Sequence, residues 1–462
     1  MLPMSLAQIA EVVQGQMHQV PDPDAVVTGP VVVDSRQAVP GSLFVAFVGE
    51  RVDGHDYAIA AVTAGAVGVL ASRPAAGPAI VVPNVLDALC ALTSWTARRM
   101  SATARIGVTG SSGKTSTKDL LGQVLCRLGP TVATAGSQNN EIGVPLTVLS
   151  APSDTKYLVL EMGARGIGHL SYLTGMVPLD VSLVLNVGSA HAGEFGGREA
   201  TAQAKGELIE ALEPDGAALL NADDPLVAAM ASRSEAPVTY FGCSPQADIR
   251  AENVALNERG QPRFDLVTPA GKAPVTLQLL GVHQVSNALA TAAVAHTLGM
   301  GTAEIADALS CAVATTGSRM QLHERADGVT VIDDAYNANP DSVAAALRAL
   351  TSMGGADRRT VAVIGEMREL GADSAAEHRA VGELAGGLGV DVVVGVGGGE
   401  AGQVVAGAAA KGAVTHLTAD RGAAADLLAG LLEAGDLVLV KASLGAGLQA
   451  LVRDLLDKTT GR

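Results

Sequence analysis

A glycine-rich segment that carries a lysine and a threonine is the clearest chemical signal in the sequence. It consists of Thr109, Gly110, Ser111, Ser112, Gly113, Lys114, Thr115 and Ser116, and it lies between the apolar residues 106–108 and a helical pattern at 112–128. Glycines let backbone amides turn toward phosphate oxygens, and the helix adds the positive end of its dipole. Val108 stands where the strict form of such a loop has glycine, but the strand–loop–helix context still predicts ATP binding. Lys114 would bring positive charge to the terminal phosphates, and Thr115 a hydroxyl to Mg²⁺.

Three polar side chains further along the chain are candidates for the same site. Glu161 ends the apolar residues 157–160, His191 follows a strand pattern at 181–187, and Lys205 lies in a helical segment. The carboxyl ends of parallel strands are where α/β sheets bind ligands, so Glu161 is a candidate Mg²⁺ ligand. On the residues alone, a solvated strand end explains Glu161 equally well. Ordinary loop and surface positions explain His191 and Lys205 better.

A second glycine pattern, Gly397, Gly399 and Gly402, follows the strand pattern at 392–396. It has the spacing of a dinucleotide fingerprint, and Asp420 lies further on. In a chain with 54 glycines a single match is weak, so we interpret it as a tight turn that binds no dinucleotide.

The elements that would position these residues form three groups along the chain. From residue 105, strand patterns at 106–108, 157–162, 181–187, 217–220 and 238–241 alternate with helical stretches, which predicts a doubly wound, mainly parallel sheet. Residues 249–280 have the short polar and apolar runs of antiparallel hairpins. A further series from 329 to 441 predicts a Rossmann-like α/β domain, and the first hundred residues predict a small α/β domain. We therefore expect an α/β protein with domains at 1–102, 103–317 and 318–462.

Composition limits the classes of function. The net charge of −16 and the lack of a basic run disfavour a nucleic-acid partner. The four cysteines form no C-x-x-C pair, which favours reduced thiols. No basic signal-peptide region and no apolar run of membrane-spanning length is visible, so we expect a cytoplasmic protein with no membrane partner.

Taken together, these segments resemble the Mur ligases, ATP-dependent amide-forming enzymes of peptidoglycan precursor synthesis. The resemblance extends from about residue 31 to about 449. The segments that carry it are 109–115, 161–163, 186–191, 204–207, 281–290 and 333–342. Within the family, residues 333–340 and 365–371, with His378, are similar to the members that add D-alanyl-D-alanine to UDP-N-acetylmuramoyl-tripeptide. The Asp-Asn-Pro-Arg motif of the diaminopimelate- or lysine-adding members is absent from the sequence.

The resemblance implies a role for each matching residue. Residues 109–116 would bind the ATP phosphates, Asn287 the adenine and Asp334 the ribose; Arg319 would reach the phosphates, and Tyr336 would lie near the nucleotide. Thr115, Glu161, His191 and Lys205 would hold two Mg²⁺ ions, with Lys205 carbamylated by CO₂. Lys114, Glu161, His191 and Lys205 would thus form the catalytic group. Substrate contacts would come from Ser35 and Arg36 at the UDP end and from Asn139, Asn140, Asn337 and Asn339. The substrates would be small molecules, and we expect a monomer.

Three positions depart from the family pattern. Gln284 replaces asparagine, Ser318 replaces glycine, and residues 441–444 read Lys-Ala-Ser-Leu in place of Lys-Gly-Ser-Arg. The last departure puts substrate contacts from the C-terminal domain in doubt.

Three alternatives remain open at this stage. They are another Mur-type amide ligase or a folylpolyglutamate synthase-like enzyme, a P-loop NTPase without ligase activity, and an oxidoreductase that uses residues 397–402.

Overall fold

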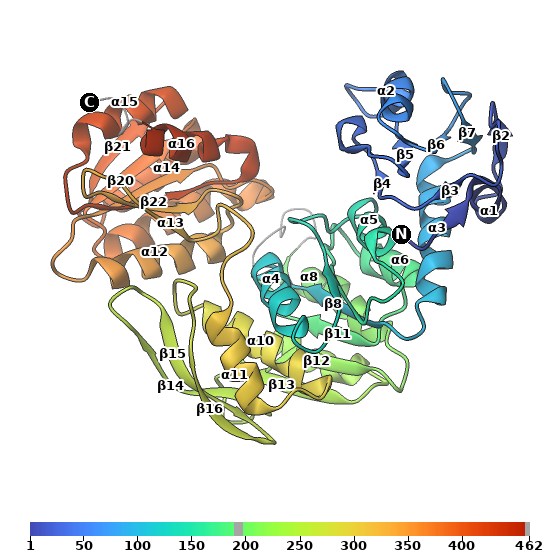
Figure 1. The fold of residues 1–462 in the computed structure, drawn as a ribbon. Coiled ribbons are helices and arrows are strands. Elements are labelled where there is room, and N and C mark those ends of the chain that lie inside the picture. Colours follow the sequence, from blue (N-terminus) through green and yellow to red (C-terminus); the bar gives the residue numbers. More distant parts are fainter. Residues whose placement is uncertain (189–196, 458–462) are drawn as a thin grey trace.

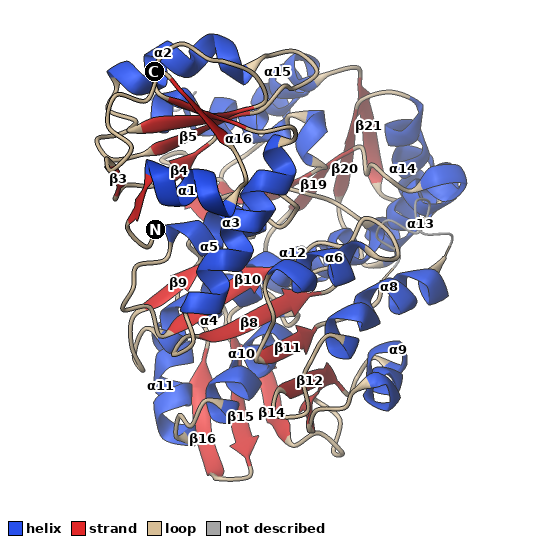
Figure 2. Cartoon of the chain, turned by 90° about the vertical axis from the view of Figure 1, so that its right-hand side faces the viewer, coloured by secondary structure: helices blue, strands red, loops and turns tan. Residues whose placement is uncertain are grey.

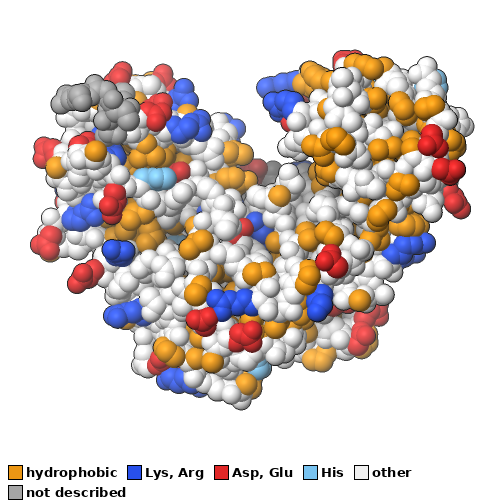
Figure 3. All heavy atoms as spheres, in the orientation of Figure 1, with side chains coloured by type: hydrophobic (Ala, Val, Ile, Leu, Met, Phe, Trp, Pro, Cys, Tyr) orange, Lys and Arg blue, Asp and Glu red, His pale blue; other side chains and the backbone are white. Residues whose placement is uncertain are grey.

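The computed structural model describes residues 1–188 and 197–457. Its strands form three α/β units in chain order, as the sequence predicted. Figure 1 shows the first and last units as separate lobes on either side of the central one, and Figure 3 shows the molecule hollowed between these lobes. We propose boundaries after residues 102 and 317, because every sheet then draws all its strands from one side of each boundary. No helix in the described part of the chain combines the length and the apolar character needed to cross a membrane.

The N-terminal unit is built on a five-stranded sheet with the order β2-β7-β6-β5-β4. Its strands β4 to β7 run parallel, because each pair is joined by a connection that crosses back over the sheet. The unit's elements are β1 (Met4–Ser5), α1 (Leu6–Val12), β2 (Gln16–His18), β3 (Val26–Val27), β4 (Val31–Val32), β5 (Leu43–Ala46), α2 (Ala58–Thr63), β6 (Gly68–Ala71), β7 (Ala79–Val81) and α3 (Val85–Arg99). The pairing of β1 with β3 was not predicted, since two-residue strands give no periodic signal.

The central unit has a nine-stranded sheet with the order β16-β15-β14-β13-β12-β11-β8-β10-β9. Strands β8 to β14 are parallel and β14 to β16 antiparallel, which confirms the mainly parallel sheet and the hairpins at 249–280. The strands are β8 (Ala104–Thr109), β9 (Thr131–Ala133), β10 (Tyr157–Glu161), β11 (Val181–Val184), β12 (Ala217–Asn221), β13 (Val238–Gly242), β14 (Ile249–Leu256), β15 (Pro262–Thr268) and β16 (Gly271–Thr276).

Helices cover both faces of the parallel part of this sheet (Figure 2), which explains why β8, β10, β11 and β12 are mostly apolar and buried. One core lies beneath α4 (Lys114–Leu125), α10 (Gln284–Thr297) and α11 (Thr302–Cys311). The opposite core lies beneath α5 (Gly143–Ser150), α6 (His169–Met176) and α8 (Arg198–Glu210), with α9 (Pro225–Ala228) beside them.

The C-terminal unit has a six-stranded sheet with the order β17-β18-β22-β19-β20-β21. All neighbours are parallel except the edge strand β17, whose exposed side chains gave no strand signal in the sequence. The strands are β17 (Gln321–Glu324), β18 (Thr330–Asp334), β19 (Thr360–Gly365), β20 (Val392–Val396), β21 (Val414–Thr418) and β22 (Leu437–Lys441). The helices are α12 (Pro340–Gly354), α13 (Ser374–Gly387) and α14 (Gly399–Ala409) on one face, and α15 (Arg421–Leu431) and α16 (Leu448–Asp457) on the other.

Candidate active site

The carboxyl ends of strands from two sheets meet at one cavity of about 590 Å³. In the central sheet β8 lies between β10 and β11, so the loop that follows β8 is flanked by the ends of both neighbours. The C-terminal sheet contributes the loops after β18, β19 and β22, which are neighbours in the order β18-β22-β19. Such edges of parallel sheets are where α/β proteins bind ligands.

The loop between β8 and α4 is held open by contacts from two other segments. Ser112 donates its backbone N–H to Asn186 Oδ1 at 2.9 Å, and Asn186 Nδ2 donates back to Ser112 O at 3.2 Å. Gly113 has a φ of +79°, and a Cβ there would lie 2.4 Å from Asn287 Oδ1. Only glycine fits this position, because both the conformation and the space exclude a side chain. The loop amides and the first turn of α4 therefore face the cavity.

Lys114 and Thr115 begin α4 and line the cavity. Lys114 Nζ donates to Gly110 O at 2.6 Å, which folds its ammonium across the loop. Burial lowers the pKa of Lys114, although the carboxylate of Glu161 opposes this shift. Lys114 thus brings positive charge to a place where little water can screen it.

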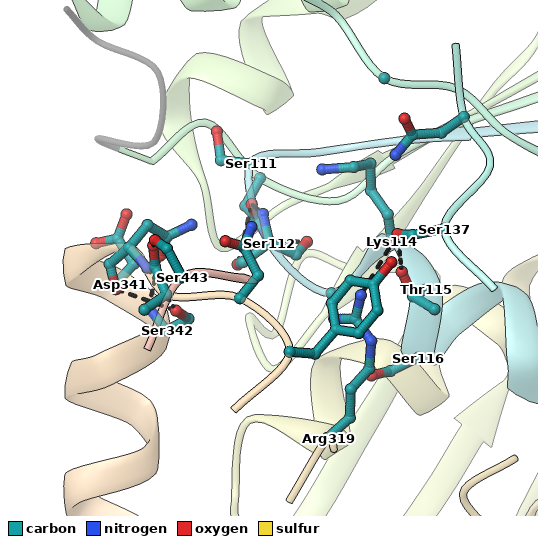
Figure 4. A pocket seen from close by; sticks show the side chains of 18 of the residues that line it. Ser111, Ser112, Lys114, Thr115, Ser116, Ser137, Arg319, Asp341, Ser342 and Ser443 are labelled. Atoms are coloured by element: carbon teal, nitrogen blue, oxygen red, sulfur yellow. Dashed lines mark hydrogen bonds between the residues drawn. The ribbon is translucent and has the colours of Figure 1, made fainter. Parts of the chain in front are cut away.

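Ser137, in the loop after β9, contacts three of the predicted site residues, and Figure 4 shows it close to two of them, Thr115 and Arg319. Its hydroxyl lies 2.9 Å from Thr115 Oγ1, donates to Glu161 Oε1 at 3.0 Å, and is 3.4 Å from Arg319 Nη2. Asn139 Nδ2 also donates to Glu161 Oε1, at 2.7 Å. The other carboxylate oxygen, Oε2, is buried and has no hydrogen-bond partner in the described structure. Ser137 thus links Thr115 to Glu161, and a buried carboxylate oxygen without a partner fits a hard cation such as Mg²⁺, which takes one or two carboxylates together with phosphate oxygens.

Lys205 reaches the same cavity from α8, and the residue as a whole is only 2% exposed. Burial, with a smaller contribution from the charge of Lys114, lowers its pKa well below the ordinary lysine value. No hydrogen bond or ion pair joins it to the described residues, so the environment favours an uncharged amine.

A buried ion pair fixes the C-terminal side of the cavity. Lys441, the last residue of β22, donates to Asp334 Oδ2 at 2.5 Å and to Asn337 O at 3.0 Å. Burial raises the pKa of Asp334, and the charge of Lys441 opposes that rise. Close by, the guanidinium of Arg319 lies 4.3 Å from the ring centre of Tyr336, a cation–π contact at the junction of the two units.

Most of the predicted site residues meet in this cavity. Its lining includes, among the predicted residues, Ser111, Ser112, Gly113, Lys114, Thr115, Ser116, Asn139, Asn140, Glu161, Lys205, Asn287, Arg319, Asp334, Tyr336, Asn337 and Asn339. Thr109 and Gly110 lie behind it, buried beneath the loop. Ser35 and Arg36 lie apart, in the short helical turn after β4 of the N-terminal unit, where Arg36 pairs with Asp34 at 2.6 Å. The prediction for His191 lies outside the described residues.

Sequence reasoning missed two residues that organise the site. Ser137 gave no signal, because a serine in a polar loop resembles any other turn residue. Lys441 was noted only as part of residues 441–444, which depart from the family pattern. Its partner, Asp334, became evident only from the pairing of β22 with β18 in the sheet. The glycines at 397, 399 and 402 do not line the cavity: Gly397 lies in the turn between β20 and α14, and Gly399 and Gly402 lie in the first part of α14.

Comparison with known proteins identifies the family. Residues 30–89 match "Mur ligase family, catalytic domain", residues 108–295 match "Mur ligase middle domain", and residues 318–444 match "Mur ligase, glutamate ligase domain". The chain is also 46% identical over 506 aligned positions to UDP-N-acetylmuramoyl-tripeptide–D-alanyl-D-alanine ligase of Mycobacterium tuberculosis, covering 100% of this chain and 99% of that one. The protein belongs to the Mur ligase family.

Other Mur ligases match along the whole chain as well. The enzyme of Escherichia coli with the same name is 34% identical, with 100% of both chains covered. A crystal structure of MurF from Acinetobacter baumannii superposes with a TM-score of 0.87 at 31% identity, covering 98% of this chain and 99% of that one. MurF of Thermotoga maritima, solved in complex with ADP, superposes with a TM-score of 0.80 at 29% identity, covering 94% and 98%. These matches confirm the predicted three-domain α/β fold.

Proposed function

We propose that this Mur ligase joins D-alanyl-D-alanine to UDP-N-acetylmuramoyl-tripeptide, using ATP to activate the terminal carboxylate of the tripeptide. The whole-length similarity to enzymes of that name supports the choice of substrates. The observation that carries the proposal is the single cavity in which the phosphate loop, Glu161 and Lys205 face the strand ends of the C-terminal unit. A reaction between two substrates and a nucleotide needs such a shared space.

ATP would bind with its phosphates on residues 109–116. Thr109 and Gly110 would act from beneath the loop, since they shape its backbone without reaching the cavity. Asn287, whose carbonyl packs against Gly113, would face the adenine. From the other side, Arg319 would reach the phosphates, Asp334 would accept from the ribose hydroxyls, and Tyr336 would lie along the nucleotide. The Thermotoga maritima relative was solved in complex with ADP, which supports the use of an adenine nucleotide.

Two Mg²⁺ ions would be held by Thr115, Glu161, His191 and Lys205. The orphaned oxygen of Glu161 and the hydroxyl of Thr115 fit a cation that also binds phosphate. When bound, the metal ions supply charge neutralisation to the approaching anions. The part assigned to His191 comes from the family resemblance alone.

Lys205 would carry a carbamate derived from CO₂. An uncharged amine can attack the carbon of CO₂, forming an N–C bond and releasing one proton, so that the side chain becomes an anion. The burial that disfavours the ammonium form therefore also prepares Lys205 for this reaction. The modification turns an uncharged amine near Lys114 into an anionic oxygen ligand suited to Mg²⁺.

The chemistry follows from the weakness of a carboxylate as an electrophile. The terminal carboxylate of the tripeptide, placed by Asn139 and Asn140, would attack the γ-phosphate of ATP, forming an acyl phosphate and releasing ADP. Lys114 would neutralise charge on the transferring phosphoryl group. The amine of D-alanyl-D-alanine would then attack the acyl carbon, lose its proton and expel phosphate. Asn337 and Asn339, on the loop that leads into α12, would help to place this second substrate.

The UDP end of the substrate would lie on the N-terminal unit, at Ser35 and Arg36. Arg36 pairs with Asp34, but its side chain is 87% exposed and so remains accessible to an anionic substrate group. We further propose that the enzyme works as a monomer in the cytoplasm. Its four cysteines are free thiols, in keeping with a reducing compartment, and gel filtration would test the monomeric state.

One assay tests the proposed function. Phosphate release should require both UDP-N-acetylmuramoyl-tripeptide and D-alanyl-D-alanine, and single amino acids should not replace the dipeptide. Ligation of a single amino acid would favour another Mur-type ligase. Phosphate release without either substrate would favour an NTPase that is not a ligase.

A further inference from the structure

Arg368 stands on the C-terminal wall of the cavity, in the loop that follows β19. Its guanidinium donates to Gly445 O at 3.1 Å and lies 3.9 Å from a carboxylate oxygen of Glu366. The side chain is 55% exposed, and its other N–H groups make no hydrogen bond with the described residues. Arg368 therefore presents unused donors to the cavity.

The loop that carries Arg368 is rigidly built. Ser443 Oγ accepts from the backbone N–H of Arg368 at 3.0 Å and donates to Ala338 O at 3.2 Å, so one buried hydroxyl ties together the loops after β18, β19 and β22. Behind the loop, the N–H of Met367 donates to the buried ring of His378 at 2.9 Å. A guanidinium on such a base is preorganised, which lowers the cost of binding.

The guanidinium of Arg368 lies against Gly445, in space that a side chain at position 445 would fill. A Cβ at Gly445 would lie 2.1 Å from Arg368 Nη1, closer than any real contact. The neighbouring Leu444 is exposed and apolar, so it brings no competing charge. The position of the guanidinium thus depends on a glycine in a second loop.

The other cations on this wall are already engaged. Lys441 is buried against Asp334, and Arg319 lies on the ring of Tyr336 beside Ser137. Lys114 and Lys205 belong to the opposite wall, where the phosphates would bind. Arg368 is the cation of the described C-terminal wall that remains available to a second substrate.

We infer that Arg368 binds the carboxylate of D-alanyl-D-alanine, an inference that rests on the proposed function. The dipeptide must direct its amine toward the acyl phosphate, which leaves its carboxylate at the far end. A carboxylate taken from water into a cavity needs a charged partner. The planar guanidinium offers two parallel N–H donors to such a group, a geometry that an ammonium lacks.

The test compares D-alanyl-D-alanine with its C-terminal amide, D-alanyl-D-alaninamide, as amine substrates. The unmodified enzyme should prefer the acid by about 10- to 100-fold in kcat/KM, because the amide removes a charge-assisted hydrogen bond. Arg368→Gln should lose that preference through a higher KM for the acid, while the KM values for ATP and the UDP-substrate stay within about twofold. Arg421→Gln, which changes an exposed arginine at the start of α15, is the matched control and should keep the preference.

Gly445→Ala probes the same position without removing the arginine. Its new methyl group should displace the guanidinium and lower the acid preference at unchanged melting temperature. A purely structural role of Arg368 would weaken both acceptors equally, and an unchanged acid preference in Arg368→Gln would overturn the inference. An unchanged preference in Gly445→Ala contradicts the position of the guanidinium described above. If the unmodified enzyme ligates neither acceptor, the proposed function fails first.

Discussion

Replacing Lys441 by methionine should destabilise the C-terminal unit strongly, because it leaves Asp334 buried without its cation. The side chains of Lys441 and Asp334 are 3% and 12% exposed and lie 2.5 Å apart. Removal of one partner from a buried ion pair costs about 3–5 kcal/mol of the free energy of unfolding. In a unit of about 150 residues, each kcal/mol lowers the melting temperature by about 2–4 °C, which gives a drop of about 6–20 °C. Methionine keeps the length of the lysine stem, so the change isolates the charge.

The effect should also depend on pH in a definite direction. Burial already raises the pKa of Asp334, and without Lys441 that pKa rises further above the value in the unfolded chain. Such a carboxyl group is accommodated best when protonated, and the stability it contributes is lost as pH rises through the folded-state pKa. The loss in free energy of unfolding caused by Lys441→Met should therefore be larger at about pH 8 than at about pH 5.

Differential scanning calorimetry of the ligand-free protein measures both effects. Asp334→Asn with Lys441→Met should recover most of the loss, because no buried charge is then left alone. Lys411→Met, at an exposed turn of the same unit, is the matched control and should have the same melting temperature as the unmodified protein. The reasoning is refuted if Lys441→Met lies within about 1 kcal/mol of the unmodified protein, or if the double variant is no more stable than the single one.

Three further predictions concern the central unit. Glu161→Gln should leave the ligand-free protein at least as stable as the unmodified protein, because it removes a buried charge. It should also abolish the rise in melting temperature that MgATP causes. A clear loss of stability in the ligand-free variant would contradict this reasoning. Gly113→Ala should weaken ATP binding at least tenfold in calorimetric titration, because the residue has a φ of +79° and its new methyl group would clash with Asn287. The control is Gly136→Ala, where φ is +56° but the surrounding space is open. It should cost only about 1 kcal/mol of stability and leave ATP binding intact. Lys205→Ala should lose most ligation and regain part of it with an added small carboxylate such as acetate, and full activity in the unrescued variant would remove the carbamate proposal.

The sequence was sufficient to predict most of the buried parallel strands and the phosphate loop, but not the short or exposed strands β1, β2, β3, β9 and β17. Parallel strands buried on both faces leave unbroken apolar runs, and the loop between β8 and α4 has its own glycine pattern. The helix at 112–128 was predicted too early at its start and too late at its end. In the structure α4 begins at Lys114, because Gly113 has a left-handed conformation that no helix contains.

The contacts that assemble the site could not be predicted from the sequence. Asp334 and Lys441 meet because β22 inserts between β18 and β19, and nothing local in either segment encodes that strand order. Ser137 and Arg368 likewise acquire partners only when distant loops come together. Spacing along one segment reveals a motif, whereas a contact between loops depends on the topology of the whole sheet.

A hydroxyl group carries one proton, so Ser137 can donate only one hydrogen bond to its neighbours at a time. While it donates to Glu161, it can only accept from Thr115 and Arg319. Arg319 arrives from beyond the proposed boundary at residue 317, so a rotation of the C-terminal unit that withdraws this arginine would change how the serine oxygen is shared. Such a rotation would alter the hydrogen bonding of the Glu161 carboxylate in the central unit through this one oxygen atom.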